Sequence, residues 1–261
     1  MGQTDLMPPS RRSPSNATLF GSLSLAAFAE LFDGLPRVMA CAKGTDRKYM
    51  YANQMFADRA GCRRVSQVIG RTAIELFASD LAAAYDAQDD SVLETGRPLQ
   101  DQLELIGTSV TKPRWHVTSK VRLLSDSAEV LGVLCVSVEV VGQEVHGIDG
   151  SGAAEVSAVI SQVRKSLEVQ HRIGDLAGRA GLSPAQFERY VKRAYGLAPR
   201  QLVQRLRFDE AMHLLTHTEL SIAEVAVACG FYDQPSFTRQ FRDATGFTPA
   251  AYRAGHPYKQ P

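Results

Sequence analysis

The sequence predicts two domains, an α+β domain built on an antiparallel sheet and then an all-helical domain. Up to residue 140 the chain holds five strand-like segments with short helices between them, whereas the last hundred residues hold helical periodicity only. A glycine-rich stretch at 141–153 separates the two. Residues 1–154 carry 15 basic against 18 acidic side chains, and residues 155–261 carry 14 against 10. A basic second domain suits a polyanionic partner.

The elements of the first domain follow from local signals. Residues 1–18 have too little apolar material to pack and are expected to form a flexible tail. Apolar residues at helical spacing predict a helix that ends before Gly34-Leu35-Pro36. Asn53 is a good cap for a helix over 54–60, and a longer helix over 80–95 ends at Gly96. Five strands are expected, at Val38–Ala42, Tyr49–Ala52, Leu99–Ile106, Trp115–Leu124 and Val130–Val140.

The segment Trp115–Leu124 alternates apolar and polar side chains, which predicts a half-buried antiparallel strand. His116 lies on the face opposite its apolar stripe. Helices covering one face of the sheet leave room for a ligand pocket. The candidate lining is Met39, Tyr51, Phe56, Leu76 and Trp115, and ordinary core is the alternative role for these side chains.

Several classes of site have little support. The four cysteines lie far apart among apolar neighbours, so buried free thiols are expected rather than a disulfide framework or zinc site. His213 and His217 lack the glutamate of a zinc protease motif, and no glycine-rich phosphate loop, nucleophile elbow or paired-carboxylate motif is present. No catalytic residue, cofactor or metal is assigned. The longest apolar run, Val130–Val138, is too short for a bilayer span, and the N-terminal segment is too polar for export.

The second domain contains an internal repeat of about fifty residues. Each copy is a short helix, a glycine turn at Gly181 or Gly230, and a longer helix. A tight glycine turn lets two helices cross steeply, so that the second one presents its N-terminal face outward, as insertion into a major groove requires. Seven helices are expected, the first with an apolar stripe from Val156 to Leu167 and the others at 173–180, 184–195, 199–215, 222–229, 234–245 and 249–254.

The repeat resembles a known family over residues 160–255. The matching stretches are Leu176-Ala177, Gly181-Leu182-Ser183-Pro184, Gly196-Leu197-Ala198-Pro199, Arg205-Leu206-Arg207 and the segment from Ser221 to Tyr252. They resemble the AraC/XylS family of bacterial transcription regulators. The resemblance implies two helix-turn-helix units joined by one long helix, here 199–215, with both recognition helices in successive major-groove segments.

The resemblance also implies which side chains contact DNA. Arg forms two hydrogen bonds with guanine, Gln forms two with adenine, and Glu accepts a hydrogen bond from the amino group of cytosine. Pro235 departs from the pattern, since it stands where a polar side chain reads a base. For any single exposed arginine, the alternative is that its side chain contacts only solvent. The base-contacting candidates are Ala185, Glu188, Arg189, Gln234, Ser236 and Arg239. The phosphate-contacting candidates are Ser183, Lys192, Arg193, Arg207, Ser221 and Arg242.

The first domain resembles a PAS domain over residues 25–140. The resemblance rests on the stretch from Tyr51 to Phe56, on Ile69-Gly70-Arg71-Thr72, on Thr95-Gly96-Arg97-Pro98 and on the last two strands. PAS domains sense small molecules, bind cofactors or dimerise. The expected organisation is a tail at 1–18, a PAS-like sensor or dimerisation domain at 19–140, a linker at 141–153 and an AraC-type DNA-binding domain at 154–261.

Together these features predict a cytoplasmic, non-enzymatic transcription regulator controlled through its PAS-like domain. The expected partners are double-stranded DNA, a small-molecule effector, a second copy of the chain through the N-terminal domain, and RNA polymerase. The alternative is a protein-binding signalling adaptor with little DNA contact, which Ala185 and Pro235 favour. A third alternative, a cofactor-bearing redox enzyme, predicts a coloured preparation.

Overall fold

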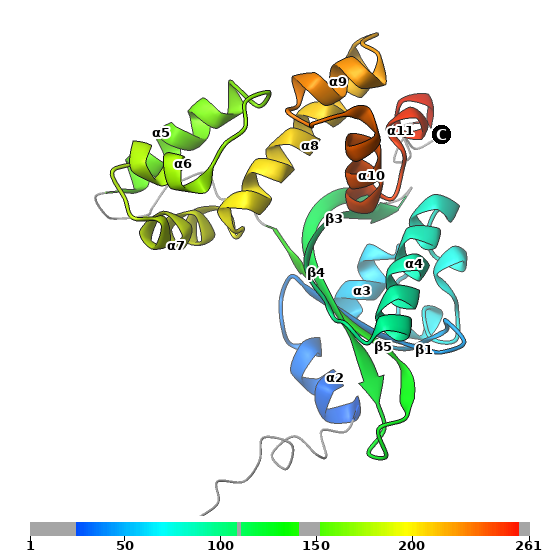
Figure 1. Cartoon of the computed structure of the whole chain (residues 1–261). Coiled ribbons are helices and arrows are strands. Elements are labelled where there is room, and N and C mark those ends of the chain that lie inside the picture. The colour runs from blue at the N-terminus through cyan, green and yellow to red at the C-terminus, as the bar shows by residue number, and fades with distance from the viewer. Residues whose placement is uncertain (1–24, 109–110, 141–151, 256–261) are drawn as a thin grey trace, which may run out of the picture.

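The computed structural model describes residues 25–108, 111–140 and 152–255 (Figure 1). The expected tail at 1–18 and most of the expected linker lie outside these residues. Within the described part of the chain an α+β domain precedes a helical one, as predicted. The first domain contains α2 (Leu25–Asp33), β1 (Val38–Gly44), β2 (Tyr49–Ala52), α3 (Gln54–Arg59), α4 (Ser79–Thr95), β3 (Leu99–Thr108), β4 (Thr111–Leu124) and β5 (Val130–Glu139), with short 3₁₀ turns at Val65–Gln67 and Ala73–Glu75.

The five predicted strands form one sheet in the order β2-β1-β5-β4-β3, and every neighbouring pair is antiparallel. Asn53 connects the start of α3 to this sheet. Its Oδ1 accepts hydrogen bonds from the Phe56 and Ala40 amides, each at 3.0 Å, and its Nδ2 donates to the Val38 carbonyl at 2.7 Å. The predicted cap therefore also fixes β1 beside the helix.

The polar face of β4 is buried, whereas its apolar face is buried at Trp115 and exposed further along the strand. His116, Thr118 and Lys120 are at most 4% exposed because α3 and α4 cover this side of the sheet, whereas Val121 on the other face is 42% exposed. The alternation predicted which side chains share a face of the strand. The more deeply buried of the two faces is the polar one. Burial lowers the pKa of His116 to about 4, with its Nδ1 2.9 Å from the Arg114 carbonyl oxygen.

Two groups of helices pack on the outer face of the sheet. Near β1 and β2, α2 covers it, where Phe32 packs against Ala40 and Tyr51. Near β3 and β4 the helical domain covers it, and α10 lies against β3 (Figure 1). The helices α3 and α4 cover the opposite face of the sheet, and α10 also contacts α4, where Gly246 lies against Leu81.

The helical domain has the seven predicted helices within the described residues. They are α5 (Ala153–Arg164), α6 (Ile173–Arg179), α7 (Pro184–Tyr195), α8 (Pro199–His217), α9 (Ile222–Ala228), α10 (Gln234–Thr245) and α11 (Pro249–Gly255). Their core is aromatic, with the rings of Phe231, Phe237 and Phe241 in consecutive contact and Phe208 against two of them. No helix in the described residues combines the length and apolarity that a bilayer span needs.

Candidate nucleic-acid interface and N-terminal cavity

Two helix-turn-helix units stand at opposite ends of α8. The first consists of α6 and α7 and the second of α9 and α10 (Figure 1). The 19 residues of α8 span about 28 Å at 1.5 Å per residue. One helical turn of DNA measures about 34 Å, so a connection of this length suits recognition helices that enter successive turns of one groove.

Each recognition helix begins at a capping side chain. Ser183 Oγ accepts from the Gln186 amide at 3.3 Å, and Gln186 Oε1 accepts in return from the Ser183 amide at 3.0 Å. At the second unit Asp233 Oδ1 accepts from the Ser236 amide at 2.7 Å. Asp233 was not singled out in the sequence, although an acidic residue directly before a helix is a typical N-cap.

The predicted base-contacting side chains lie on the outward faces of these helices. On α7, Ala185, Glu188 and Arg189 are exposed, and Glu188 Oε1 forms an ion pair with Lys192 Nζ at 2.9 Å. On α10, Gln234 and Arg239 are exposed. Ser236 differs, since it is half-buried and its Oγ accepts from Gln240 Nε2 at 2.8 Å.

The predicted phosphate-contacting side chains divide into two groups. Lys192, Arg193 and Arg242 are exposed, and the two serines cap α7 and α9. Arg207 differs, because its Nη2 donates to the Val169 carbonyl at 3.0 Å and burial lowers the pKa of its guanidinium. The structure therefore gives Arg207 an internal role.

Arg207 belongs to the junction between the two units. The segment that follows α5 packs on the turn of the second unit, where Gln170 Nε2 donates to the Gly230 carbonyl at 2.9 Å. Gly230 has φ +75°, and a Cβ atom on it would lie 2.0 Å from the Leu167 carbonyl oxygen. This close approach of two backbones requires glycine and holds the two units at one relative position.

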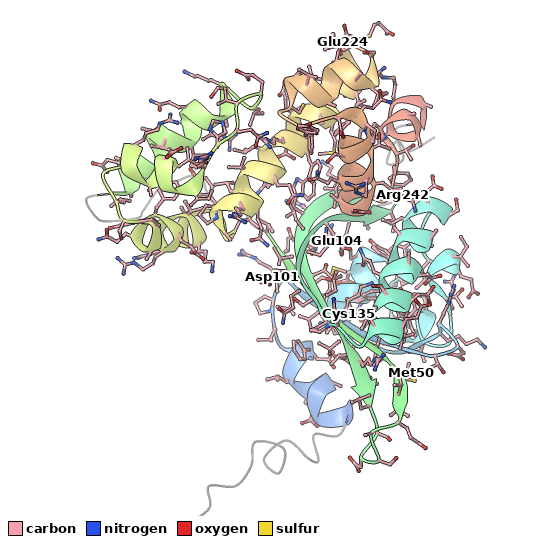
Figure 2. All side chains as sticks on the ribbon, in the orientation of Figure 1. Met50, Asp101, Glu104, Cys135, Glu224 and Arg242 are labelled. Atoms are coloured by element: carbon pink, nitrogen blue, oxygen red, sulfur yellow. The ribbon has the colours of Figure 1, made fainter. Side chains whose placement is uncertain are left out.

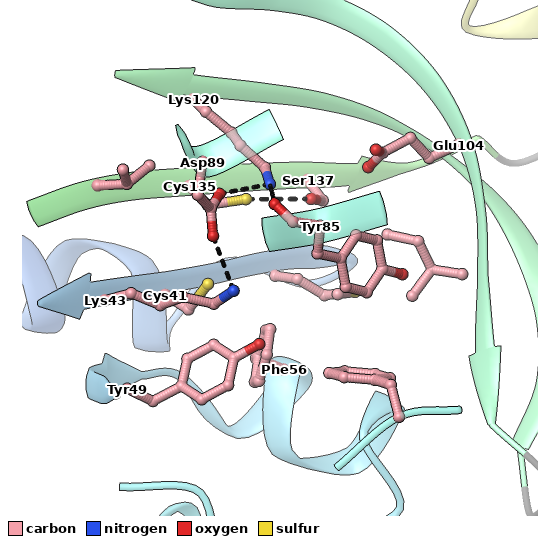
Figure 3. Close-up of a pocket in the computed structure, with 14 residues that line it drawn as sticks. Cys41, Lys43, Tyr49, Phe56, Tyr85, Asp89, Glu104, Lys120, Cys135 and Ser137 are labelled. Atoms are coloured by element: carbon pink, nitrogen blue, oxygen red, sulfur yellow. Dashed lines mark hydrogen bonds and ion pairs between the residues drawn. The ribbon is translucent and has the colours of Figure 1, made fainter. Parts of the chain in front are cut away.

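The α+β domain encloses a cavity of about 40 Å³ between the sheet and its helices (Figure 3). Space for one water is about 10–15 Å³, so the cavity has room for about three. Its wall includes two lysines that share a carboxylate. Asp89 Oδ2 lies 2.7 Å from Lys43 Nζ, and Asp89 Oδ1 lies 2.6 Å from Lys120 Nζ.

These buried charges determine one another's protonation. Burial alone raises the pKa of the Asp89 carboxyl, but the ammonium groups of Lys120 and Lys43 outweigh burial, so the pKa is lowered. For Lys120, burial acts to lower the pKa, and the Asp89 carboxylate reverses the direction. The ion pair between Asp89 and Lys120 therefore favours the charged form of both groups inside the domain.

Two of the five predicted pocket residues line this cavity. Met39 and Phe56 lie on its wall, and Leu76 does not. Tyr51 and Trp115 project from the opposite face of the sheet, where Tyr51 packs with Ala40 and Trp115 stacks on Phe208. The cavity is more polar than expected because the polar face of β4 is the one turned inward.

The two domains meet through β3, β4, α8 and α10. Trp115 Nε1 donates to Asp209 Oδ1 at 2.8 Å, and the Trp115 and Phe208 rings stack with centroids 6.0 Å apart. Gln201 Nε2 donates to the Asp101 carbonyl at 2.9 Å. Figure 2 shows Asp101 near the first turn of α8 and Arg242 at the end of α10 that faces α4.

Comparison with known proteins gives two domain families. Residues 32–144 match the PAS fold and residues 176–255 match the helix-turn-helix domain. The transcriptional regulator GbdR of Pseudomonas aeruginosa is 30% identical over 112 residues, which cover 43% of this chain and 30% of GbdR. The transcriptional regulator Rv1931c of Mycobacterium tuberculosis is 37% identical over 83 residues, 32% of each chain. The chain thus spans about a third of the length of these curated relatives.

Solved structures are similar over the helical domain. The DNA-binding domain of AdpA in complex with a target DNA is 33% identical, with a TM-score of 0.38, and the match covers 39% of this chain and 92% of that one. An AraC-type regulator from Chromobacterium violaceum is 30% identical, with a TM-score of 0.36 over 39% of this chain and 94% of that one. By the two family matches, the chain joins a PAS fold to a helix-turn-helix domain.

Proposed function

We propose that this protein is a sequence-specific, DNA-binding transcription regulator that its PAS fold controls in response to a small molecule or another signal. The observation that carries the proposal is the pair of capped recognition helices, held by α8 with their N-terminal faces exposed. Amides at helix starts favour phosphate, and the exposed side chains favour base edges. GbdR and Rv1931c are both named as transcriptional regulators, so the proposal assigns no enzymatic step to the chain.

Sequence discrimination rests on four side chains, Glu188 and Arg189 on α7 and Gln234 and Arg239 on α10. All four are exposed, and their chemistry matches cytosine, guanine and adenine edges in the major groove. Glu188 must leave its ion pair with Lys192 to accept from a base, or the pair must contact DNA together. Ala185 and Ser236 complete the base-facing set, with smaller contributions because one is apolar and the other is half-buried. The exposed cations Lys192, Arg193 and Arg242, with the helix starts at Ser183 and Ser221, contact phosphates.

The domain contact supplies a route for control. Glu104 and Ile106 of β3 line the cavity, whereas Leu103 and Leu105 are buried on its other face, where β3 lies against α10. A ligand that moves β3 or β4 therefore changes the surface on which the helical domain rests. In the same proposal the chain acts in the cytoplasm as a homodimer through its N-terminal domain, and contacts RNA polymerase.

A selection of DNA fragments tests the proposal. Purified full-length protein is expected to enrich one sequence class, with affinity that falls steeply as salt rises. Arg239→Ala should weaken binding to that class by about 1–3 kcal/mol and relax preference at one base, whereas Arg193→Ala should weaken all sequences alike and reduce the salt dependence. No enrichment at any salt concentration would instead favour a protein-binding adaptor.

A further inference from the structure

Two of the four cysteines face each other across the sheet. Cys41 of β1 and Cys135 of β5 are directly opposite in the antiparallel register, and both line the cavity. Figure 3 shows both sulfur atoms on the same side of the sheet, next to the lysines and Asp89. Cys62 and Cys229 lie elsewhere, after α3 and at the end of α9. All four are free thiols in this structure.

The register places the two thiols within bonding reach. Directly opposite residues of antiparallel strands have Cα atoms about 4.5–5.5 Å apart, inside the range of about 4.4–6.8 Å that disulfides span. Their Cβ atoms are about 4.5–5.5 Å apart, and a disulfide brings them to about 3.8 Å. The strands must therefore close by about 1 Å, a small local movement between β1 and β5.

The surroundings make the two thiols unequal. Lys120 of β4 is the register partner of Cys135 on its other side, so Cys135 lies between a thiol and an ammonium group. A hydrogen bond from the Cys41 thiol and the charge of Lys120 together lower the pKa of Cys135, against the effect of burial. The same hydrogen bond and burial raise the pKa of Cys41. Cys135 is the better nucleophile, and Cys41 stays protonated beside it.

We propose that Cys135 and Cys41 are a peroxide-reactive pair that closes to an intramolecular disulfide. The Cys135 thiolate attacks one oxygen of hydrogen peroxide, the O–O bond breaks, and the departing hydroxide takes up a proton as water. Cys135 is then a sulfenic acid. The Cys41 sulfur attacks the Cys135 sulfur, and the sulfenic hydroxyl leaves as water with the Cys41 proton. Two thiols and one peroxide thus give one disulfide and two waters.

The cavity suits this oxidant. Its volume of about 40 Å³ accommodates a molecule the size of two waters but not a bulky oxidant. Both sulfur atoms belong to its wall, so the peroxide contacts them without unfolding of the domain. Both cysteines are free thiols in the structure, so the pair is available for oxidation. The proposal does not depend on DNA binding.

Mass spectrometry of the full-length chain tests the proposal. Reduced protein is treated with hydrogen peroxide, denatured with N-ethylmaleimide and digested. The expected result is a linked peptide pair containing Cys41 and Cys135, reversed by dithiothreitol, with Cys62 and Cys229 alkylated. Cys41→Ser should instead accumulate a sulfenic acid that dimedone traps at Cys135.

The control is a Cys62→Ser/Cys229→Ser variant, which should form the same disulfide as the wild type. Two outcomes overturn the proposal. One is alkylation of all four wild-type thiols after peroxide treatment under native conditions, and the other is a linkage that involves Cys62 or Cys229. Because the wild-type chain alone decides between these results, a variant that fails to fold leaves the test intact.

Discussion

A substitution of Gly230 by alanine should separate the two helix-turn-helix units, while the equivalent change at Gly181 should not. Both glycines form the turn between the two helices of a unit, and both have positive φ, +75° for Gly230 and +65° for Gly181. A Cβ atom at Gly181 meets nothing within 4 Å, whereas one at Gly230 meets the Leu167 carbonyl oxygen at 2.0 Å. The Cβ atom at Gly230 would also lie 2.8 Å from Arg207 Nη2, so the two variants share backbone strain and differ in what the new Cβ atom meets.

The expected magnitudes follow from that difference. A left-handed conformation costs a residue with a Cβ atom about 1–2 kcal/mol, which is the whole cost expected for Gly181→Ala. At Gly230 the two backbones must also move apart by about 1.4 Å, from 2.0 Å to the 3.4 Å at which the contact becomes an ordinary one. That movement disrupts the hydrogen bonds from Gln170 to Gly230 and from Arg207 to Val169, and a typical net contribution is about 0.5–1.5 kcal/mol each. We expect Gly230→Ala to cost about 2–5 kcal/mol.

Urea unfolding followed by far-ultraviolet circular dichroism measures both free energies. Gly230→Ala should also lose affinity for a DNA site that needs both units, yet retain weak binding to half of it. Equal costs for the two variants, within about 0.5 kcal/mol, would contradict this prediction, because the close contacts at Gly230 would then contribute nothing.

Three further predictions concern the first domain and its contact with the second. Asp89→Asn leaves the Lys120 ammonium group without its carboxylate and leaves Lys43 with Asp86 alone, at 3.3 Å, so it should cost about 3–5 kcal/mol in urea unfolding. The more exposed Asp90→Asn should cost under about 1 kcal/mol, and similar costs for the two variants would contradict the role of the buried charges. Trp115→Phe keeps an aromatic ring at this position but removes the N–H group that donates to Asp209. Amide hydrogen exchange in β3 and β4 should therefore accelerate. Unchanged exchange would show that this hydrogen bond does not stabilise the domain contact. The pKa of His116 is about 4 in the folded chain against 6.5 for the free side chain, so the unfolded chain binds the proton first as pH falls. The free energy of unfolding should therefore drop by about 3 kcal/mol between pH 6.5 and 4. Urea unfolding of His116→Gln should show no such drop, and an unchanged pH dependence in this variant would contradict the prediction.

Local signals predicted the elements well. Asn53 and Ser183 cap the helices that their positions predicted, and Gly96 and Gly196 end helices with φ +69°. These features act within one turn of chain, so the sequence contains all the information that they need. The five strands were predicted from alternation and turn residues, whereas the five-stranded antiparallel sheet was expected from the PAS resemblance.

Contacts between distant segments were harder to predict. Alternation along β4 sorts Trp115 and His116 onto opposite faces, but only the positions of α3, α4 and α8 decide which face is covered by which domain. Trp115 was therefore expected in the pocket and instead contacts the helical domain. The hydrogen bond from Arg207 to the Val169 carbonyl could not be predicted for a similar reason, since the two residues lie 38 positions apart in sequence.

Trp115 is the single tryptophan of the chain, and it lies where the two domains touch. Its indole ring stacks on Phe208 beside the Asp209 carboxylate, and it becomes exposed to solvent if the two domains separate. The protein thus has a built-in fluorophore, whose emission should shift to longer wavelength when the helical domain leaves the sheet. No dye or added label is needed to follow docking in real time. The same optical signal, recorded during additions of DNA, peroxide or trial ligands, reports which of them moves the two domains relative to one another.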